Sequence, residues 1–240
     1  MGQTCIITQP AKQEGKSMGN DVLINFVLDK SGSMFDIRDD TIGGFNQYLE
    51  EQRRLGVELG QRTRVSLTLF DTSFEHRYIS ANVEDIPPLS PETYQPGGNT
   101  ALYDAVGSSI RAVEKLNPDG MVLFVIQTDG LENSSQEWTR SSVFNLITEK
   151  REKQDWQFVF LGADQDAYAS GGQIGVAGTS TLSYGRQHSR RAHEALGRST
   201  AAWRSGASAA IDIAVHQPEF DVEEPGSGPD NSVGSRPTST

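Results

Sequence analysis

The run Val22-Leu23-Ile24-Asn25-Phe26-Val27-Leu28, followed directly by Asp29-Lys30-Ser31-Gly32-Ser33, decides the fold. The first part is almost continuously apolar, which is typical of a strand covered on both faces. A second run of this kind, Met121 to Ile126, lies in the second half of the chain. Two such buried strands predict a mainly parallel sheet enclosed between two layers of helices.

Helical and strand patterns alternate around these two runs. Apolar residues recur at helical spacing over residues 36–55, 101–116, 138–153, 164–173 and 186–204. Further strands are predicted over residues 64–70, 74–79 and 156–161. The first two of these are joined by the turn Asp71-Thr72-Ser73, so they should pair antiparallel. The order predicts a doubly wound α/β fold, with a mainly parallel central sheet, one antiparallel edge strand and helices on both faces.

Gly43-Gly44 lies inside the first predicted helix. Glycine lowers helix propensity, so its presence there needs a packing reason. We expect the helix backbone to approach the sheet closely at this point.

Composition divides the chain into one domain and two polar ends. Residues 1–19 show no apolar period, and residues 217–240 are rich in Pro, Gly, Ser and acids. Such segments cannot bury enough apolar surface to fold. We therefore expect a disordered leader over residues 1–19, one domain over residues 20–205, and a disordered acidic tail over residues 206–240.

The charge balance and the single cysteine limit the classes of function. A net charge of -11 argues against a broad nucleic-acid surface, which needs clustered Lys and Arg. Cys5 has no second cysteine to pair with, and no secretory signal or membrane-spanning apolar run is present. We therefore expect a cytoplasmic protein that binds neither nucleic acid nor membrane.

One segment departs from the acidic balance. Residues 185–204 contain five arginines against the single acid Glu194. Two interpretations stay open: a solvated face of a helix, or a docking surface for an acidic segment.

Polar side chains follow both buried strands at the point where each strand ends. Asp29, Ser31 and Ser33 follow the first strand, and Gln127-Thr128-Asp129-Gly130 follows the second. A third polar loop, Gly97-Gly98-Asn99-Thr100, precedes the helix expected at residue 101. Because open α/β sheets bind ligands beyond the carboxyl ends of their strands, we expect these three loops to meet at one edge.

Each loop taken alone has a structural explanation. Asp and Ser after a strand often form a turn or cap the next helix, and Thr100 stands where such a cap is expected. The three loops taken together favour a metal site instead. Carboxylates and hydroxyls are hard oxygen donors that suit Mg²⁺ or Mn²⁺ better than Zn²⁺. The candidate ligands are Asp29, Ser31, Ser33, Thr100 and Asp129.

This pattern resembles the metal-ion-dependent adhesion site (MIDAS) of von Willebrand factor type A (vWA) domains. That family has D-x-S-x-S, then a Thr in a Gly-rich loop, then an Asp in a T-D-G-like turn, and the five candidate ligands match every position. The resemblance covers about residues 20–180 and implies a Rossmann-like vWA fold. It also implies that Ser31, Ser33 and Thr100 contact the ion directly, whereas Asp29 and Asp129 hold waters and supply charge.

The resemblance further implies a protein-binding module in which a Mg²⁺-type ion holds a Glu or Asp of a partner protein. Within the family, the chain is similar to the compact, intracellular bacterial or phage-borne members, and the lack of a secretory signal and of disulfides agrees with this. An alternative is an accessory subunit of an AAA+ ATPase or of a stress-resistance complex. A Mg²⁺-dependent phosphoryl-transfer enzyme is disfavoured, because Ser31 stands where the D-x-D phosphatase pattern has its second acid. We therefore expect a protein that is not an enzyme.

Overall fold

The computed structural model describes residues 20–116, 118, 120–163, 166–185 and 188–216. The strands are β1 (Asp21–Asp29), β2 (Arg62–Phe70), β3 (Phe74–Asn82), β4 (Met121–Thr128), β5 (Gln157–Ala163) and β6 (Thr181–Tyr184). The α-helices are α1 (Arg38–Leu59), α2 (Leu102–Glu114), α3 (Arg140–Gln154), α4 (Ala167–Gln173) and α5 (Ser189–Arg204). Short 3-10 helices are η1 (Gly32–Ile37), η2 (Val83–Asp85), η3 (Gly178–Ser180) and η5 (Ala214–His216). None of the helices in these residues combines the length and the apolar content that crossing a bilayer requires.

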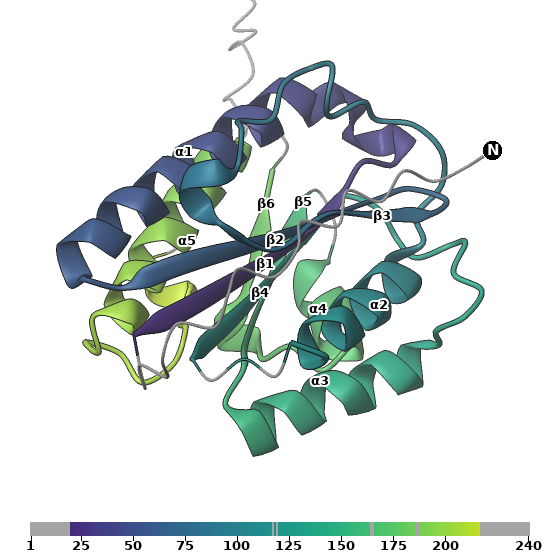
Figure 1. Cartoon of the computed structure of the whole chain (residues 1–240). Coiled ribbons are helices and arrows are strands. Elements are labelled where there is room, and N and C mark those ends of the chain that lie inside the picture. The colour runs from purple at the N-terminus through teal and green to yellow at the C-terminus, as the bar shows by residue number, and fades with distance from the viewer. Residues whose placement is uncertain (1–19, 117, 119, 164–165, 186–187, 217–240) are drawn as a thin grey trace, which may run out of the picture.

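The strands form one six-stranded sheet in the order β3-β2-β1-β4-β5-β6 (Figure 1). β3 pairs antiparallel with β2, and the other four neighbouring pairs are parallel. The predicted α/β class and its single antiparallel edge strand are therefore confirmed. β6 is a strand that the sequence analysis does not predict. Its four residues lie in a Gly-rich stretch and are too few to show an apolar period.

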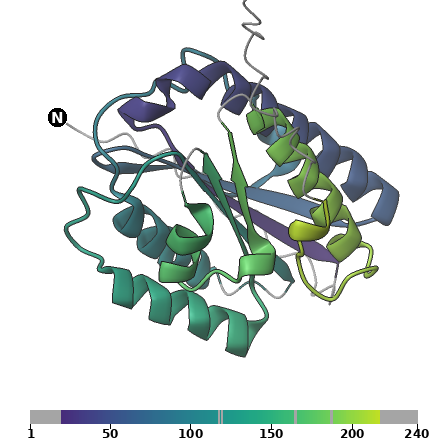
Figure 2. The ribbon, with the colours of Figure 1, turned by 180° about the vertical axis from the view of Figure 1, so that it is seen from behind.

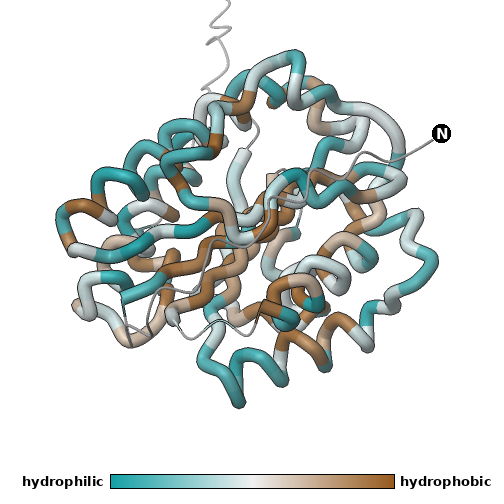
Figure 3. Tube along the Cα trace, viewed as in Figure 1, coloured by the Kyte–Doolittle hydropathy of each residue, from teal (hydrophilic) through white to brown (hydrophobic). Residues whose placement is uncertain are grey.

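Helices cover both faces of the sheet. α1 and α5 lie on one face, and α2, α3 and α4 lie on the other (Figures 1 and 2). The side chains of β1 alternate between these layers: Ile24, Phe26 and Leu28 join the core under α1 and α5, whereas Leu23 and Val27 join the core under α2 and α3. This double burial is the physical reason for the continuous apolar run, which Figure 3 shows as a brown band through the central strands.

The close approach at Gly44 is to α5 and not to the sheet, so that prediction is wrong. A Cβ atom built on Gly44 would lie 2.3 Å from Nδ1 of His193 in α5. A second contact of this kind joins the same two helices, because a Cβ atom on Gly197 would lie 2.0 Å from the carboxylate of Glu51. The glycines therefore allow α1 and α5 to pack directly on one another (Figure 2).

The arginines of α5 divide into one buried residue and several exposed ones. Arg204 is 3 % exposed and donates hydrogen bonds to the side chains of Gln52, Gln61 and Thr63, so it ties α5 to α1 and β2. Arg186 lies outside the described residues. The remaining charges stand on an exposed surface formed by Arg190, Arg191 and Arg198.

The packed chain continues beyond residue 205, where the sequence analysis places the end of the domain. Ile211 and Ile213 are 1 % and 0 % exposed and belong to the core under α1 and α5. The hydroxyl of Ser180 donates to the carbonyl of Ile211 at 2.7 Å, and the N–H of Ile213 donates to the carbonyl of Thr179 at 2.9 Å. Residues 206–216 are therefore part of the fold, whereas 1–19 and 217–240 lie outside the described residues.

Gly44→Ala should destabilise the protein, because the new methyl group would overlap the ring of His193. We expect the free energy of unfolding, measured by urea denaturation, to fall by about 1–3 kcal/mol. Gly43→Ala is the matched control, since its Cβ atom would meet only Arg190, at 3.9 Å. That variant should gain up to about 1 kcal/mol from helix propensity. Effects of the same sign in both variants would contradict this account of the helix crossing.

His193 should make the stability of the protein depend on pH. Burial lowers its pKa to about 4, although the hydrogen bond to the carbonyl of Ser189 opposes the shift. The ordinary pKa of histidine is 6.5. Between pH 6.5 and pH 4, His193 therefore binds a proton in the unfolded state but not in the folded state. The stability that neutral His193 contributes is therefore fully present above pH 6.5. It is lost as the pH falls toward 4, by about 3 kcal/mol in total.

The measurement is urea denaturation at several pH values on the wild type and on His193→Gln. The variant should show a flatter decline of stability over this pH range, because it has no group at position 193 to titrate. Identical pH profiles for the two proteins would contradict the assignment to His193.

Candidate functional site

Three loops meet at the carboxyl edge of the sheet, beside the point where the strand order switches. β2 and β3 lie on one side of β1 and the later strands lie on the other, so the switch falls between β1 and β4. The loops after β1 and β4 leave the sheet at this point. The loop before α2 joins them through two backbone hydrogen bonds. The N–H of Gly32 donates to the carbonyl of Gly98 at 3.1 Å, and the N–H of Gly97 donates to the carbonyl of Lys30 at 2.8 Å.

Asp29 is the last residue of β1 and its side chain is fully buried. Its carboxylate accepts hydrogen bonds from the hydroxyl of Thr128 at 2.5 Å and from the N–H of Ser31 at 2.6 Å. Its backbone carbonyl accepts a further bond from the hydroxyl of Tyr94. Burial raises the pKa of Asp29 to about 6, although the bonds from Thr128 and Ser31 oppose the shift. A cation near this carboxyl group would favour its ionised form.

Three hydroxyl groups converge on the space beside Gly130. A Cβ atom built on this glycine would lie 3.1 Å from Oγ1 of Thr100, 3.5 Å from Oγ of Ser33 and 3.9 Å from Oγ of Ser31. Ser33 also donates to the carboxylate of Asp129 at 2.6 Å and lies 3.2 Å from Ser31 between their oxygens. The structure therefore brings the five predicted side chains to one place, and we call the three hydroxyls beside Gly130 the hydroxyl cradle.

Ser31 and Thr100 do not act as helix caps, which is the structural alternative for both. Ser31 occupies the N-cap position of η1, but its side chain makes no capping hydrogen bond. The N-cap of α2 is Ala101, one residue beyond Thr100, and it has no side-chain cap. Neither hydroxyl is therefore committed to a helix end.

The loop that follows β4 holds Thr100 in place. The side chain of Asn133 accepts from the N–H of Thr100 at 2.9 Å, and the N–H of Asn133 donates back to the Thr100 carbonyl at 3.0 Å. Glu132 accepts from the first turn of α2, and Asp104 of α2 accepts from the backbone N–H groups of residues 136–138. The sequence analysis does not predict these supports, because the partners are some thirty residues apart.

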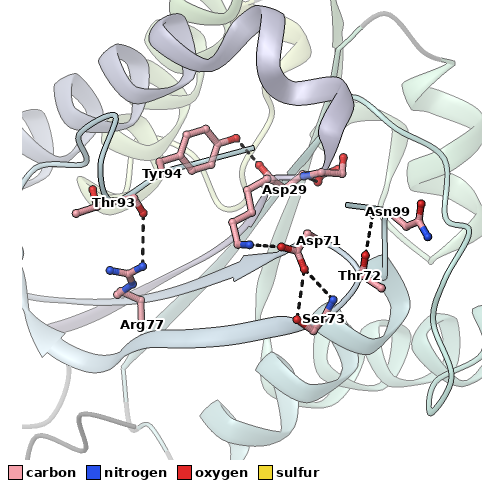
Figure 4. A network of polar contacts seen from close by, with 10 residues as sticks. Asp29, Asp71, Thr72, Ser73, Arg77, Thr93, Tyr94 and Asn99 are labelled. Carbon is pink, nitrogen blue, oxygen red and sulfur yellow. Dashed lines mark hydrogen bonds and ion pairs between the residues drawn. The ribbon is translucent and has the colours of Figure 1, made fainter. Parts of the chain in front are cut away.

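The turn between β2 and β3 connects the other two loops (Figure 4). Lys30 pairs with the carboxylate of Asp71, whose backbone carbonyl accepts from the N–H of Ala101 at 2.7 Å. The hydroxyl of Thr72 accepts from the N–H of Asn99 at 2.9 Å. Burial alone would raise the pKa of Asp71, but the hydrogen bonds from Lys30 and from the turn outweigh it and hold that pKa below its usual range. The edge hairpin therefore braces both the loop after β1 and the loop before α2.

The cradle offers only oxygen atoms. Within the part of the chain that the structure describes, no three His, Cys, Asp or Glu side chains gather where they could hold an ion. A metal site at this edge must therefore combine hydroxyls with the two carboxylates. Such a hard donor set suits Mg²⁺ or Mn²⁺, and the missing side chain of Gly130 leaves space beside the hydroxyls. The donors present thus fit the predicted metal, and their role as ligands stays a prediction.

Comparison with known proteins finds relatives at the level of the fold. No protein-family model matches the chain, and no curated protein sequence matches it. The vWF domain of the type V pili tip protein Mfa5 from Porphyromonas gingivalis is 9 % identical, covers 77 % of this chain and 96 % of its own, and has a TM-score of 0.57. The manganese-loaded TRAP protein of Plasmodium vivax is 14 % identical over 71 % of both chains, with a TM-score of 0.51.

A third similar structure is proximal thread matrix protein 1 from the mussel byssus, described with a zinc-occupied MIDAS motif. It is 14 % identical, and the match has a TM-score of 0.52 and covers 74 % of this chain but only 46 % of the matrix protein. Identities this low establish the fold alone. The chain therefore has the vWA-like α/β fold, with a mostly parallel six-stranded sheet between helices.

Asp71→Asn keeps the shape of the side chain and removes its charge. Because the pair with Lys30 is partly buried, we expect unfolding to become easier by about 1 kcal/mol. Amide hydrogen exchange of residues 30–33 should also become faster. Glu149→Gln is the matched control, because it breaks an exposed pair with Lys153 within α3 and should change neither quantity appreciably. If the two variants behave alike in urea denaturation and in hydrogen exchange, the bracing role of Asp71 is wrong.

Proposed function

We propose that this chain is a divalent-metal-dependent protein-binding module. Ser31, Ser33 and Thr100 would hold Mg²⁺ or Mn²⁺ through their hydroxyl oxygens, while Asp29 and Asp129 would hold waters of its shell and supply charge. The observation that carries the proposal is the convergence of the three hydroxyls beside Gly130. Residues distant in the chain form this cradle, and neither Ser31 nor Thr100 caps a helix.

The chemistry of the donors indicates what the partner contributes. Mg²⁺ takes about six oxygen ligands and commonly keeps several waters. Hydroxyl oxygens are neutral, so three of them leave positions open and leave positive charge in the inner shell. An anionic oxygen is the group that this charge attracts most strongly. A Glu or Asp side chain of a partner protein supplies such an oxygen.

The structural neighbours support binding to proteins rather than catalysis. They include a byssus thread matrix protein and a pilus tip protein, and two are described as zinc-occupied or manganese-loaded. The net charge of -11 supports a protein partner over a nucleic acid. Because the single cysteine allows no disulfide within the chain, which fits a reducing compartment, we extend the proposal to a cytoplasmic location.

Gly130→Ala tests the cradle without removing any candidate ligand. The added methyl group would lie 3.1 Å from Oγ1 of Thr100 and 3.5 Å from Oγ of Ser33, so it would crowd the hydroxyls that are proposed to bind the ion. We expect Mg²⁺ or Mn²⁺ at a hundred times its Kd to stabilise the wild type by about 2.7 kcal/mol, seen as a rise in Tm that a chelator reverses. The rise should be absent in Gly130→Ala and in Asp29→Ala.

Gly97→Ala is the control for this experiment. It lies in the loop that leads to Thr100, and a Cβ atom built there meets nothing within 4 Å. It should respond to the metal as the wild type does. A wild type whose Tm does not change with metal, or a Gly130→Ala variant with a full response, would contradict the proposed site.

A further inference from the structure

Two large apolar side chains stand exposed in the loops around the hydroxyl cradle. Phe35 in η1 is 65 % exposed, and Leu131 after β4 is 70 % exposed. The apolar neighbours of Phe35 behave differently, since Met34 and Ile37 are 0 % and 3 % exposed. The local fold therefore buries two of the three large apolar residues of η1 and leaves the third in water.

Both residues belong to the loops that carry candidate ligands. Phe35 comes two residues after Ser33, and Leu131 comes two residues after Asp129. Consecutive Cα atoms are 3.8 Å apart, so each of the two Cα atoms lies within about 8 Å of the Cα atom of a candidate ligand. The hydrogen bond of 2.6 Å between Ser33 and Asp129 joins the two loops. One site thus has an exposed apolar residue on each of two loops.

Phe35 and Leu131 follow β1 and β4 and so lie at the carboxyl edge of the sheet. Other exposed apolar residues, such as Val57 near the end of α1 and Leu116 after α2, stand just before β2 and β4, at the amino edge. Exposed apolar residues scattered singly are common, so their presence alone means little. What distinguishes Phe35 and Leu131 is that each lies two residues from a candidate ligand, whereas Tyr168, which is 46 % exposed and follows β5 at the same edge, does not.

We propose that the partner segment carries a bulky apolar residue next to its carboxylate, and that Phe35 and Leu131 contact that residue. This inference rests on the metal-dependent binding proposed above and adds the chemistry of the partner. Burying the two side chains would remove apolar surface from water, which favours association. It would also exclude water around the ion and its carboxylate, where a lower dielectric constant strengthens their attraction. An acidic segment without an apolar residue would contact the ion but leave Phe35 and Leu131 in water.

A peptide selection on the full chain tests the proposal. The probe is a display library of disulfide-closed peptides with one fixed Glu or Asp between randomised neighbours, selected in Mg²⁺ and eluted with EDTA. We expect the eluted peptides to carry Leu, Ile, Phe, Met or Trp beside the acid. Binding of one such peptide, measured by fluorescence anisotropy, should weaken about tenfold in Phe35→Ser and in Leu131→Ser. The response of Tm to Mg²⁺ should stay unchanged in both variants.

Val57→Ser is the matched control, because Val57 is 81 % exposed and lies at the opposite edge of the sheet. It should bind the peptide as the wild type does. Eluted peptides without apolar preference, or affinities within twofold of the wild type for Phe35→Ser and Leu131→Ser, would overturn this inference and leave the metal-dependent module intact. Peptides that bind equally with EDTA, or with the acid changed to its amide, would overturn the proposed function. A selection that yields no peptide eluted by EDTA would count against both.

Discussion

A buried carboxylate at the end of the central strand is the constraint on which the rest of this structure depends. A carboxylate out of water is costly unless hydrogen bonds or a cation compensate it. Asp29 meets that requirement with the N–H of Ser31, from its own loop, and with the hydroxyl of Thr128, from the end of β4. The bond from Thr128 also ties β1 to β4 at the switch in strand order, which is where doubly wound sheets bind their ligands.

The remaining parts of the cradle are held by residues that do not belong to it. Asn133 fixes the backbone of Thr100 from one side, and Lys30 and Asp71 brace the loops from the other. β1 is packed on both faces, so the loop that carries Ser31 and Ser33 begins at a strand that is held firmly in the core. A site whose positions are set by such outer contacts is preorganised, and a ligand need not order it on binding.

The carboxyl edge combines two kinds of surface that a partner could use. The cradle is polar and suits a cation, whereas Phe35 and Leu131 beside it are apolar and exposed. In protein interfaces a few buried anchor residues, often aromatic, supply much of the affinity, and polar contacts surround them. In this arrangement the ion would select the acid, and the apolar pair would select the residue next to it.

The sequence by itself determined the α/β class, the antiparallel edge strand and the five candidate ligands. These features depend on local patterns: apolar runs, strand ends and the residues that follow them directly. Only the tertiary structure decided the contacts between distant residues. Gly44 faces His193 rather than the sheet, Asn133 supports Thr100, and Ile211 extends the domain beyond residue 205. Likewise, three nearby apolar residues in η1 look alike in the sequence, and only the packing of the 3-10 turn against the core determines that Phe35 is the one left in water.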